Sequence, residues 1–210
     1  TTREESVPLI FELLSLGACP AGVVLPLRLA TPGTVASMSP ARALAAAAER
    51  GDLVTLHELL SHGADADEPY ASGYTPLYFA CECGHHDCAR ALLDANANVN
   101  RTVNLNWTAL ASACYCGHVK CAHALLDADA KVDKLDDFGS TALNWACRKG
   151  HVACARALLK AGADADKAGS DGQTALVLAC RRGCAECVQA LVNARADPGK
   201  TTPGGENALM

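Results

Sequence analysis

The residues best suited to chemistry in this chain are its twelve cysteines and seven histidines. Several cysteines are closely spaced, such as Cys81, Cys83 and Cys88, and Cys184 and Cys187 form a C-x-x-C pair. Such spacings occur in zinc sites and in redox-active dithiols. A structural zinc ion needs four ligands that converge on one point, each sulfur at about 2.3 Å. Metal binding and thiol chemistry are therefore the first functions to consider.

The spacing argues against a four-ligand metal site. Cys81 and Cys83 are two positions apart on an expected helix, so their side chains point in different directions. Cys83 and Cys116 are expected on neighbouring helices roughly 8–10 Å apart, beyond the Cα separation of about 7 Å that a disulfide tolerates. Cys184 and Cys187 share one helical face and supply two ligands at most. We therefore expect no metal and no cofactor, with Cys83 and Cys116 the most exposed thiols.

Most of the cysteines recur at a fixed interval, which suggests a packing role. Eight of the twelve occupy two positions that repeat every 33 residues. A free cysteine behaves as a small buried hydrophobe, so the pattern indicates a reduced protein inside the cell, in the cytoplasm or the nucleus. A thiol- or metal-responsive protein that uses Cys83, Cys116 and Cys184 is the alternative. The two recurring sets are Cys81, Cys114, Cys147 and Cys180, and Cys88, Cys121, Cys154 and Cys187.

The histidines give no sign of catalysis. His85, His118 and His151 each follow a glycine at the same interval. This recurrence indicates turn residues that form hydrogen bonds with the backbone. The sequence has no Ser/His/Asp set, paired carboxylate motif, phosphate-binding loop or dinucleotide-binding motif. We expect no catalytic residues, no enzymatic activity and no small-molecule substrate.

The same 33-residue interval organises the chain from residue 37 onward. It superposes Thr75, Thr108, Thr141 and Thr174, each followed by Pro or Ala and then Leu. Self-similarity of this length predicts a stack of repeats. Residues 1–36 are expected to be a flank, or a degenerate repeat with an insertion. The expected repeats are 37–69, 70–102, 103–135, 136–168 and 169–201, with a partial unit at 202–210.

Each unit is expected to contain a turn, a short helix, a glycine and a second helix. The threonines are good N-caps for the first helices. The second helix has an apolar stripe, and it should end on a residue that tolerates a left-handed conformation. Gly63, Gly162, Asn96 and Asp129 suit that position, whereas Arg195 suits it poorly. The sequence therefore predicts strain at Arg195.

These units resemble the ankyrin repeat family over about residues 37–210. The segment Asp136–Asp164 contains DDFGSTALNWACRKGH and ALLKAGAD, and YTPLYFACECGH begins at Tyr74. They are similar to the family's turn, T-P-L-H-x-A, G-H and G-A-D pattern. The resemblance implies an all-α solenoid of stacked helix–turn–helix repeats, with β-hairpin-like fingers and a concave binding surface. The family's His after T-P-L is replaced, so the inter-repeat hydrogen bonds that it usually supplies are in question. The residues in its place are Tyr78, Ala111, Asn144 and Val177.

Candidate partner-binding residues lie where the repeat does not dictate the residue type, in the finger tips and at the ends of the first helices. Stacking should align these positions along one groove, with an aromatic half and a basic half. Aromatic residues and arginine are enriched at the energetic centres of interfaces. We expect a protein partner, in the form of an extended or helical segment with apolar and acidic residues. The candidates are Tyr74, Glu82, Leu105, Trp107, Tyr115, Phe138, Arg148, Lys149, Arg181 and Arg182.

Composition narrows the class of partner. The net charge of −5 argues against nucleic acid, and no apolar run approaches the ~20 residues of a membrane span. The chain lacks an initiator Met and a signal-peptide pattern, so we expect a fragment of a longer protein. The expected function is a non-catalytic protein–protein interaction module within an adaptor or scaffold. A structural spacer whose helix ends are simply solvated is a further alternative.

Overall fold

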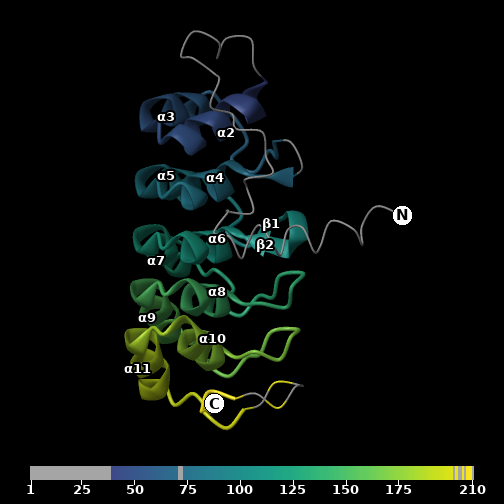
Figure 1. Cartoon of the computed structure of the whole chain (residues 1–210). Coiled ribbons are helices and arrows are strands. Elements are labelled where there is room, and N and C mark those ends of the chain that lie inside the picture. Colours follow the sequence, from purple (N-terminus) through teal and green to yellow (C-terminus); the bar gives the residue numbers. More distant parts are fainter. Residues whose placement is uncertain (1–38, 71–72, 201, 203–204, 206, 210) are drawn as a thin grey trace, which may run out of the picture. The chain divides into compact units, whose positions relative to one another are not determined.

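The computed structural model describes residues 39–70, 73–200, 202, 205 and 207–209. This part of the chain contains ten α-helices in five consecutive pairs, stacked one above the next (Figure 1). First helices pack on first helices and second helices on second helices along the stack. The first helices are α2 (Pro40–Arg50), α4 (Pro76–Glu82), α6 (Ala109–Cys116), α8 (Ala142–Lys149) and α10 (Ala175–Arg182). The second helices are α3 (Leu53–Ser61), α5 (His86–Asp94), α7 (Val119–Asp127), α9 (Val152–Lys160) and α11 (Ala185–Asn193).

Loops between the pairs project together on one side of the stack (Figure 1). One of them is a short hairpin, in which β1 (Thr102–Val103) pairs antiparallel with β2 (Trp107–Thr108) around the 3-10 turn η5 (Asn104–Asn106). A single antiparallel bridge joins Tyr70 and Tyr74 in the preceding loop. The expected all-α solenoid with hairpin-like fingers is confirmed. The flank expected at 1–36 lies outside the described residues.

Four of the five first helices begin directly after a threonine, and α2 begins after Ser39. In each case the Thr side chain accepts a hydrogen bond from the backbone N–H three residues later, which satisfies one unpaired donor of the first turn. These residues are buried, because the caps lie between neighbouring repeats. The capping residues are Thr75, Thr108, Thr141 and Thr174.

The turn after each second helix contains a residue with positive φ, as the sequence predicted. Gly63 and Gly162 adopt φ of 84° and 86°. Asn96, Asp129 and Arg195 adopt φ of 63°, 60° and 63° at the equivalent positions. Arginine has a Cβ that crowds the following carbonyl in this conformation, so Arg195 carries backbone strain.

The core of the stack is thin and consists mainly of alanine, leucine and cysteine. Seven of the eight recurring cysteines are buried, which agrees with a packing role. The exception is Cys180, which was expected at a buried position and is exposed. Cys180 lies on α10, and among the described residues no further first helix packs on the outer side of α10. Its position is therefore at the open end of the row of first helices.

Candidate partner-binding site

Four aromatic rings from two neighbouring repeats form one cluster, which we call the aromatic cluster. The Trp107 ring centroid lies 5.0 Å from that of Trp145 and 5.8 Å from that of Tyr115. The Tyr115 and Trp145 centroids are 5.5 Å apart, and that of Phe138 is 6.4 Å from Trp145. Most of these pairs meet edge to face, a favourable arrangement for aromatic rings. The cluster brings three of the expected site residues together around Trp145, which the sequence analysis did not select.

Two of the expected basic residues lie directly on this cluster. The Arg148 guanidinium carbon is 5.2 Å from the centre of the Trp145 ring, and Lys149 Nζ is 4.3 Å from that of Tyr115. Both are within the range of cation–π attraction. The expected division into an aromatic half and a basic half is therefore wrong for Arg148 and Lys149. Consecutive residues at the end of α8 reach back over the aromatic residues because the two repeats are stacked.

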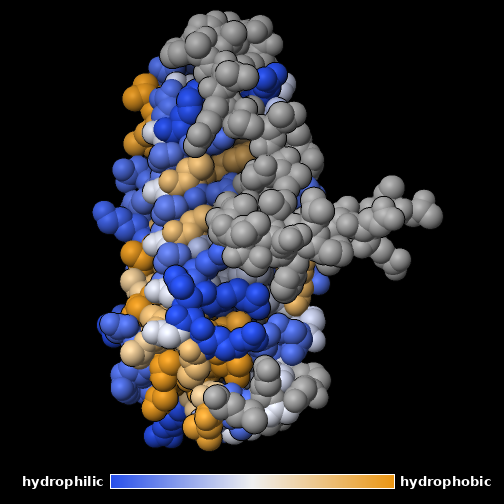
Figure 2. Space-filling view, viewed as in Figure 1, coloured by the Kyte–Doolittle hydropathy of each residue, from blue (hydrophilic) through white to orange (hydrophobic). Residues whose placement is uncertain are grey.

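The remaining two basic residues lie at the end of the next first helix. Arg181 and Arg182 are exposed in the last turn of α10. Figure 2 shows strongly hydrophilic side chains gathered over α8 and α10. The carboxylate of Asp171 balances part of the positive charge of these basic residues, since Arg148 Nη2 lies 3.6 Å from Asp171 Oδ2. Burial lowers the pKa of the Arg148 guanidinium, and the charge of Asp171 opposes that shift.

Several expected contact residues are buried. Tyr74, Trp107 and Tyr115 expose only 5%, 2% and 4% of their surface. Trp107 and Tyr115 pack inside the aromatic cluster, whereas Tyr74 packs against Tyr78 and Phe79 with centroids 5.1 Å and 5.7 Å away. These three residues shape the surface and hold its other side chains. Of the remaining candidates, Glu82, Leu105, Phe138, Arg148 and Lys149 are half-buried, and Arg181 and Arg182 are exposed.

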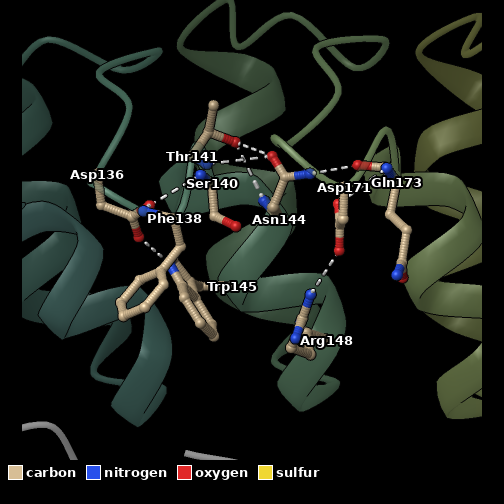
Figure 3. A network of polar contacts seen from close by, with 9 residues as sticks. All are labelled: Asp136, Phe138, Ser140, Thr141, Asn144, Trp145, Arg148, Asp171 and Gln173. Atoms are coloured by element: carbon tan, nitrogen blue, oxygen red, sulfur yellow. Dashed lines mark hydrogen bonds and ion pairs between the residues drawn. The ribbon is translucent and has the colours of Figure 1, made fainter. Parts of the chain in front are cut away.

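One buried carboxylate supports the aromatic cluster (Figure 3). Asp136 accepts a hydrogen bond of 2.6 Å from the indole nitrogen of Trp145. It also accepts backbone hydrogen bonds from Ser140 at 2.8 Å and Phe138 at 3.0 Å. Burial raises the pKa of the Asp136 carboxyl, and these hydrogen bonds act in the opposite direction. The carboxylate thus fixes the Trp145 ring and the turn that carries Phe138.

A second polar group connects this repeat to the next one (Figure 3). Asn144 Oδ1 accepts hydrogen bonds from the backbone and the hydroxyl of Thr141, which completes a capping box. Asn144 Nδ2 donates a hydrogen bond of 3.2 Å to the Gln173 carbonyl in the following finger. The side chain that replaces the family's His therefore does supply an inter-repeat hydrogen bond at this junction.

The fingers of neighbouring repeats are also bonded to each other. The Asp137 backbone N–H donates to the Leu105 carbonyl at 2.9 Å, and Asn106 Nδ2 donates to Asp137 Oδ1 at 2.7 Å. Leu105 has a φ of 63°, which directs its carbonyl out of the regular hairpin. These bonds place Leu105 and Phe138 on adjacent, connected fingers.

The histidines at the interhelical turns bond to the backbone as expected in two cases. His85 Nε2 lies 3.0 Å from the Glu49 carbonyl, and His151 Nε2 lies 3.0 Å from that of Tyr115. Each bond joins a second helix to the first helix of the preceding repeat. The structure therefore confirms a turn role for His85 and His151.

The cysteines differ from expectation at the end of the stack. Cys83 is exposed and Cys116 is half-buried, but Cys180 is also exposed and Cys184 is half-buried. The expectation that Cys83 and Cys116 are the most exposed thiols is therefore wrong for Cys116. No group of three or more potential ligands suited to a metal ion occurs within the described residues.

An open pocket of about 840 Å³ lies among the loops of the last two repeats. The Asp side chains that line it accept hydrogen bonds from backbone N–H groups of the same loops. Asp166 accepts the Asp197 backbone N–H at 2.8 Å, and Lys200 Nζ donates to the Asp166 carbonyl at 2.9 Å. The pocket is therefore a consequence of loop packing. It is lined by Asp164, Asp166, Lys167, Ala168, Gly172, Thr174, Asp197, Gly199, Lys200 and Thr202.

None of the helices in the described part of the chain has the length and apolar character needed to span a membrane. Residues 43–136 and 125–202 match the family model described as ankyrin repeats (3 copies). A segment of 57 residues is 42% identical to Inversin of Danio rerio. The matched segment is 27% of this chain and 6% of the length of that protein. The family match spans most of the chain and coincides with the stacked helix pairs and their threonine caps. The chain belongs to the ankyrin repeat family.

Proposed function

We propose that this chain is a non-catalytic module that binds a protein segment over the aromatic cluster and the adjacent basic residues. Ankyrin repeats are generally protein–protein interaction modules. The observation that carries the proposal is the placement of Arg148 over Trp145 and Lys149 over Tyr115. Packing against rings limits the freedom of these long side chains, so less conformational entropy is lost when a partner binds them.

The proposed partner segment places an acidic residue beside an apolar one. Carboxylates form charge-assisted hydrogen bonds with arginine and lysine. Two neighbouring first helices, α8 and α10, offer four cations, on Arg148, Lys149, Arg181 and Arg182. Phe138 and Leu105, on the connected fingers, offer apolar contact. The partner is proposed to be a protein, and nucleic acid, membranes and small-molecule substrates are not part of the proposal. Glu82, on α4, would disfavour acidic residues at the other end of the segment.

We also propose that the chain is the recognition part of a larger intracellular adaptor or scaffold. Buried cysteines that are free thiols support a reducing compartment. The chain spans a small part of the length of the curated relative that it matches. The repeat boundaries given above, from 37–69 to 169–201 with a partial unit at 202–210, belong to this proposal.

A peptide library that varies acidic and apolar positions, displayed on phage, tests the binding proposal. We expect enrichment of sequences in which Asp or Glu adjoins an apolar residue. The double variant R148E/K149E should weaken binding of an enriched peptide at least about tenfold, equivalent to ~1.4 kcal/mol. The matched control R90E/K120E makes the same charge change at exposed positions on α5 and α7. Equal losses in both variants, or no loss in R148E/K149E, would remove the basic residues from the proposal.

A further inference from the structure

Cys187 interacts with two other cysteines in the last two described repeats. Cys147 lies near the end of α8, Cys184 is the N-cap of α11 and Cys187 lies in the first turn of α11. The Cys187 thiol is hydrogen-bonded to the thiols of both Cys147 and Cys184. Cys147 and Cys187 are fully buried, whereas Cys184 is half-buried. The cluster therefore has one member that solvent can reach.

Equivalent positions in the earlier repeats show what is particular to this cluster. Cys81 is hydrogen-bonded to Cys121, and Cys114 to Cys154, so a buried thiol pair recurs at each junction. A buried thiol pair of this kind has a packing role in the core. In the earlier junctions the third position is histidine, at His118 and His151, the N-caps of α7 and α9. Only Cys184 among these N-caps adds a third thiol to the pair.

The exchange of histidine for cysteine also leaves space beside the sulfur. A Cβ added at Gly117 would lie 2.7 Å from His151 Nδ1, so the imidazole fills the space against the preceding repeat. A Cβ added at Gly150, the equivalent glycine, would meet nothing closer than 3.8 Å, with Cys184 Sγ at 4.0 Å. The junction at Gly150 is therefore less tightly filled than the one at Gly117, and its nearest atoms belong to the side chain of Arg182.

We propose that Cys184 and Cys187 form a reversible oxidation site, in which a hydroperoxide converts the two thiols into a disulfide. The pair occupies the start of a nine-residue helix with C-x-x-C spacing, and it is already in thiol–thiol contact. Helix N-termini stabilise thiolates, which are the reactive form of cysteine. The side chain of Arg182, one of the proposed partner-binding residues, borders the site, but the oxidation does not depend on that proposal.

Of the three thiols, only Cys187 has a lowered pKa. The hydrogen bond from Cys147 is the main reason that the pKa of Cys187 falls to about 6, and the hydrogen bond from Cys184 and the charge of Arg156 act in the same direction. The carboxylate of Glu186, 3.9 Å from Cys184 Sγ, opposes it. Burial and the hydrogen bond with Cys187 raise the pKa of the Cys184 thiol. The thiolate on Cys184 is therefore the less populated form, and it arises when the Cys184 proton passes to the Cys187 thiolate, which places the charge on the sulfur that solvent reaches.

The oxidation then proceeds in two steps. The Cys184 thiolate attacks the hydroperoxide, the O–O bond breaks, and a sulfenic acid and an alkoxide form; the alkoxide takes the proton of Cys187 and leaves as an alcohol. The Cys187 thiolate attacks the Cys184 sulfur, the S–S bond forms, and hydroxide leaves and is protonated by solvent to water. The two cysteines lose two electrons and the peroxide gains them. A small dithiol reverses the reaction by exchange.

Peptide mapping of the full chain after treatment with hydrogen peroxide tests the proposal. Trypsin releases residues 183–195 as one peptide, GCAECVQALVNAR, which contains both cysteines. After alkylation under denaturing conditions, we expect this peptide to lack two hydrogen atoms, to carry no alkyl group and to be restored by dithiothreitol. Cys114 and Cys154, a buried pair with His151 in place of cysteine at the N-cap of α9, should be alkylated in full in the same sample.

The variant C184H restores the histidine of the earlier repeats and provides the matched comparison. It should remain folded, and its loss of free thiols to peroxide should be slower by at least about tenfold than in the wild type. C184S serves the same purpose if the histidine lowers the melting temperature. The variant C180A, which removes an exposed thiol outside the cluster, should oxidise at the wild-type rate. Oxidation of C184H as fast as the wild type, or a reduced 183–195 peptide while Cys83 or Cys180 is oxidised, would overturn the proposal.

Discussion

The indole nitrogen of Trp145 donates a hydrogen bond of 2.6 Å to the carboxylate of Asp136, which lies in the finger before the same helix. The other carboxylate oxygen accepts the backbone N–H groups of Phe138 and Ser140. One side chain therefore sets both the ring at the centre of the aromatic cluster and the turn that presents Phe138. The surface proposed to bind a partner depends on this buried group.

Replacement of Asp136 by asparagine should destabilise the protein. The asparagine amide has one acceptor oxygen where the carboxylate has two, and its nitrogen is a donor. Either the Trp145 indole N–H or the backbone N–H groups of Phe138 and Ser140 therefore face this nitrogen and lose their hydrogen bonds. Leaving a buried donor unpaired costs about 1–3 kcal/mol. Urea denaturation of D136N should show a loss of that size. The control D127N, at an exposed position on α7, should stay within about 0.5 kcal/mol of the wild type, and an equally large loss there would contradict the assignment.

An exchange of Arg195 and Gly162 tests the strain at the ends of the second helices. Both residues adopt positive φ at equivalent positions, 63° and 86°. Glycine accepts this conformation freely, whereas other residues pay about 1 kcal/mol or more. R195G should raise the midpoint of thermal unfolding, and G162R should lower it by a similar amount, since nothing lies within 4 Å of a Cβ at Gly162. A lower midpoint of thermal unfolding for R195G would contradict the inference that Arg195 is strained.

The fold could be predicted from the sequence because its determinants are local and periodic. Thr141 caps α8 through the N–H of Asn144, three residues away, and Gly150 ends the same helix with a φ of 79°. Each role depends on a few neighbouring residues and recurs at every interval. The periodic cysteines have the same explanation, except at Cys180, which lies on the last first helix of the described residues.

The arrangement of the candidate site was harder to predict because it depends on side-chain directions across repeats. The sequence places Trp107 and Arg148 in different repeats, and nothing in their spacing indicates that both contact Trp145. Trp145 itself could have been considered, since the equivalent residue one and two repeats earlier is Ser112 or Phe79 and no residue type is dictated there. Asp136 belongs to the family-like turn motif, so its additional contact with the indole leaves no separate trace in the sequence.

The His151 imidazole should make stability depend on pH. Burial is the main reason that the pKa of His151 is lowered from its ordinary value of 6.5. The unfolded chain then binds more protons than the folded one, so stability rises with pH. The contribution is fully present above 6.5 and is lost as the pH falls through the lowered value of the folded state.

Variants of two histidines allow this dependence to be measured. H151Q keeps a donor for the Tyr115 carbonyl and removes the titrating group. Its stability in urea should change less than that of the wild type between about pH 7.5 and pH 5. H123Q, at an exposed position on α7, should retain the wild-type dependence. Identical pH profiles for H151Q and the wild type would show that another group is responsible.

Loss of Asn144 should weaken the connection between two particular repeats. Its amide joins the cap of α8 to the Gln173 carbonyl in the next finger, so N144A removes two bonds to Thr141 within a repeat and one bond between repeats. The expected cost is about 1–3 kcal/mol, because buried partners are left unpaired. Stability in a stacked array is a sum of terms within repeats and between neighbours. The loss should therefore be felt most by the terminal pair α10 and α11.

Hydrogen exchange distinguishes this local effect from a general loss of stability. In N144A, amides of α10 and α11 should exchange faster relative to the wild type than amides of α4 and α5, because the terminal repeat opens without its neighbour. T141A provides the comparison, since it removes the hydroxyl that caps α8 and leaves the Asn144 amide able to reach Gln173. T141A should lower stability without selective exchange in the terminal pair. A uniform acceleration across all helices in N144A would show that Asn144 stabilises only its own repeat.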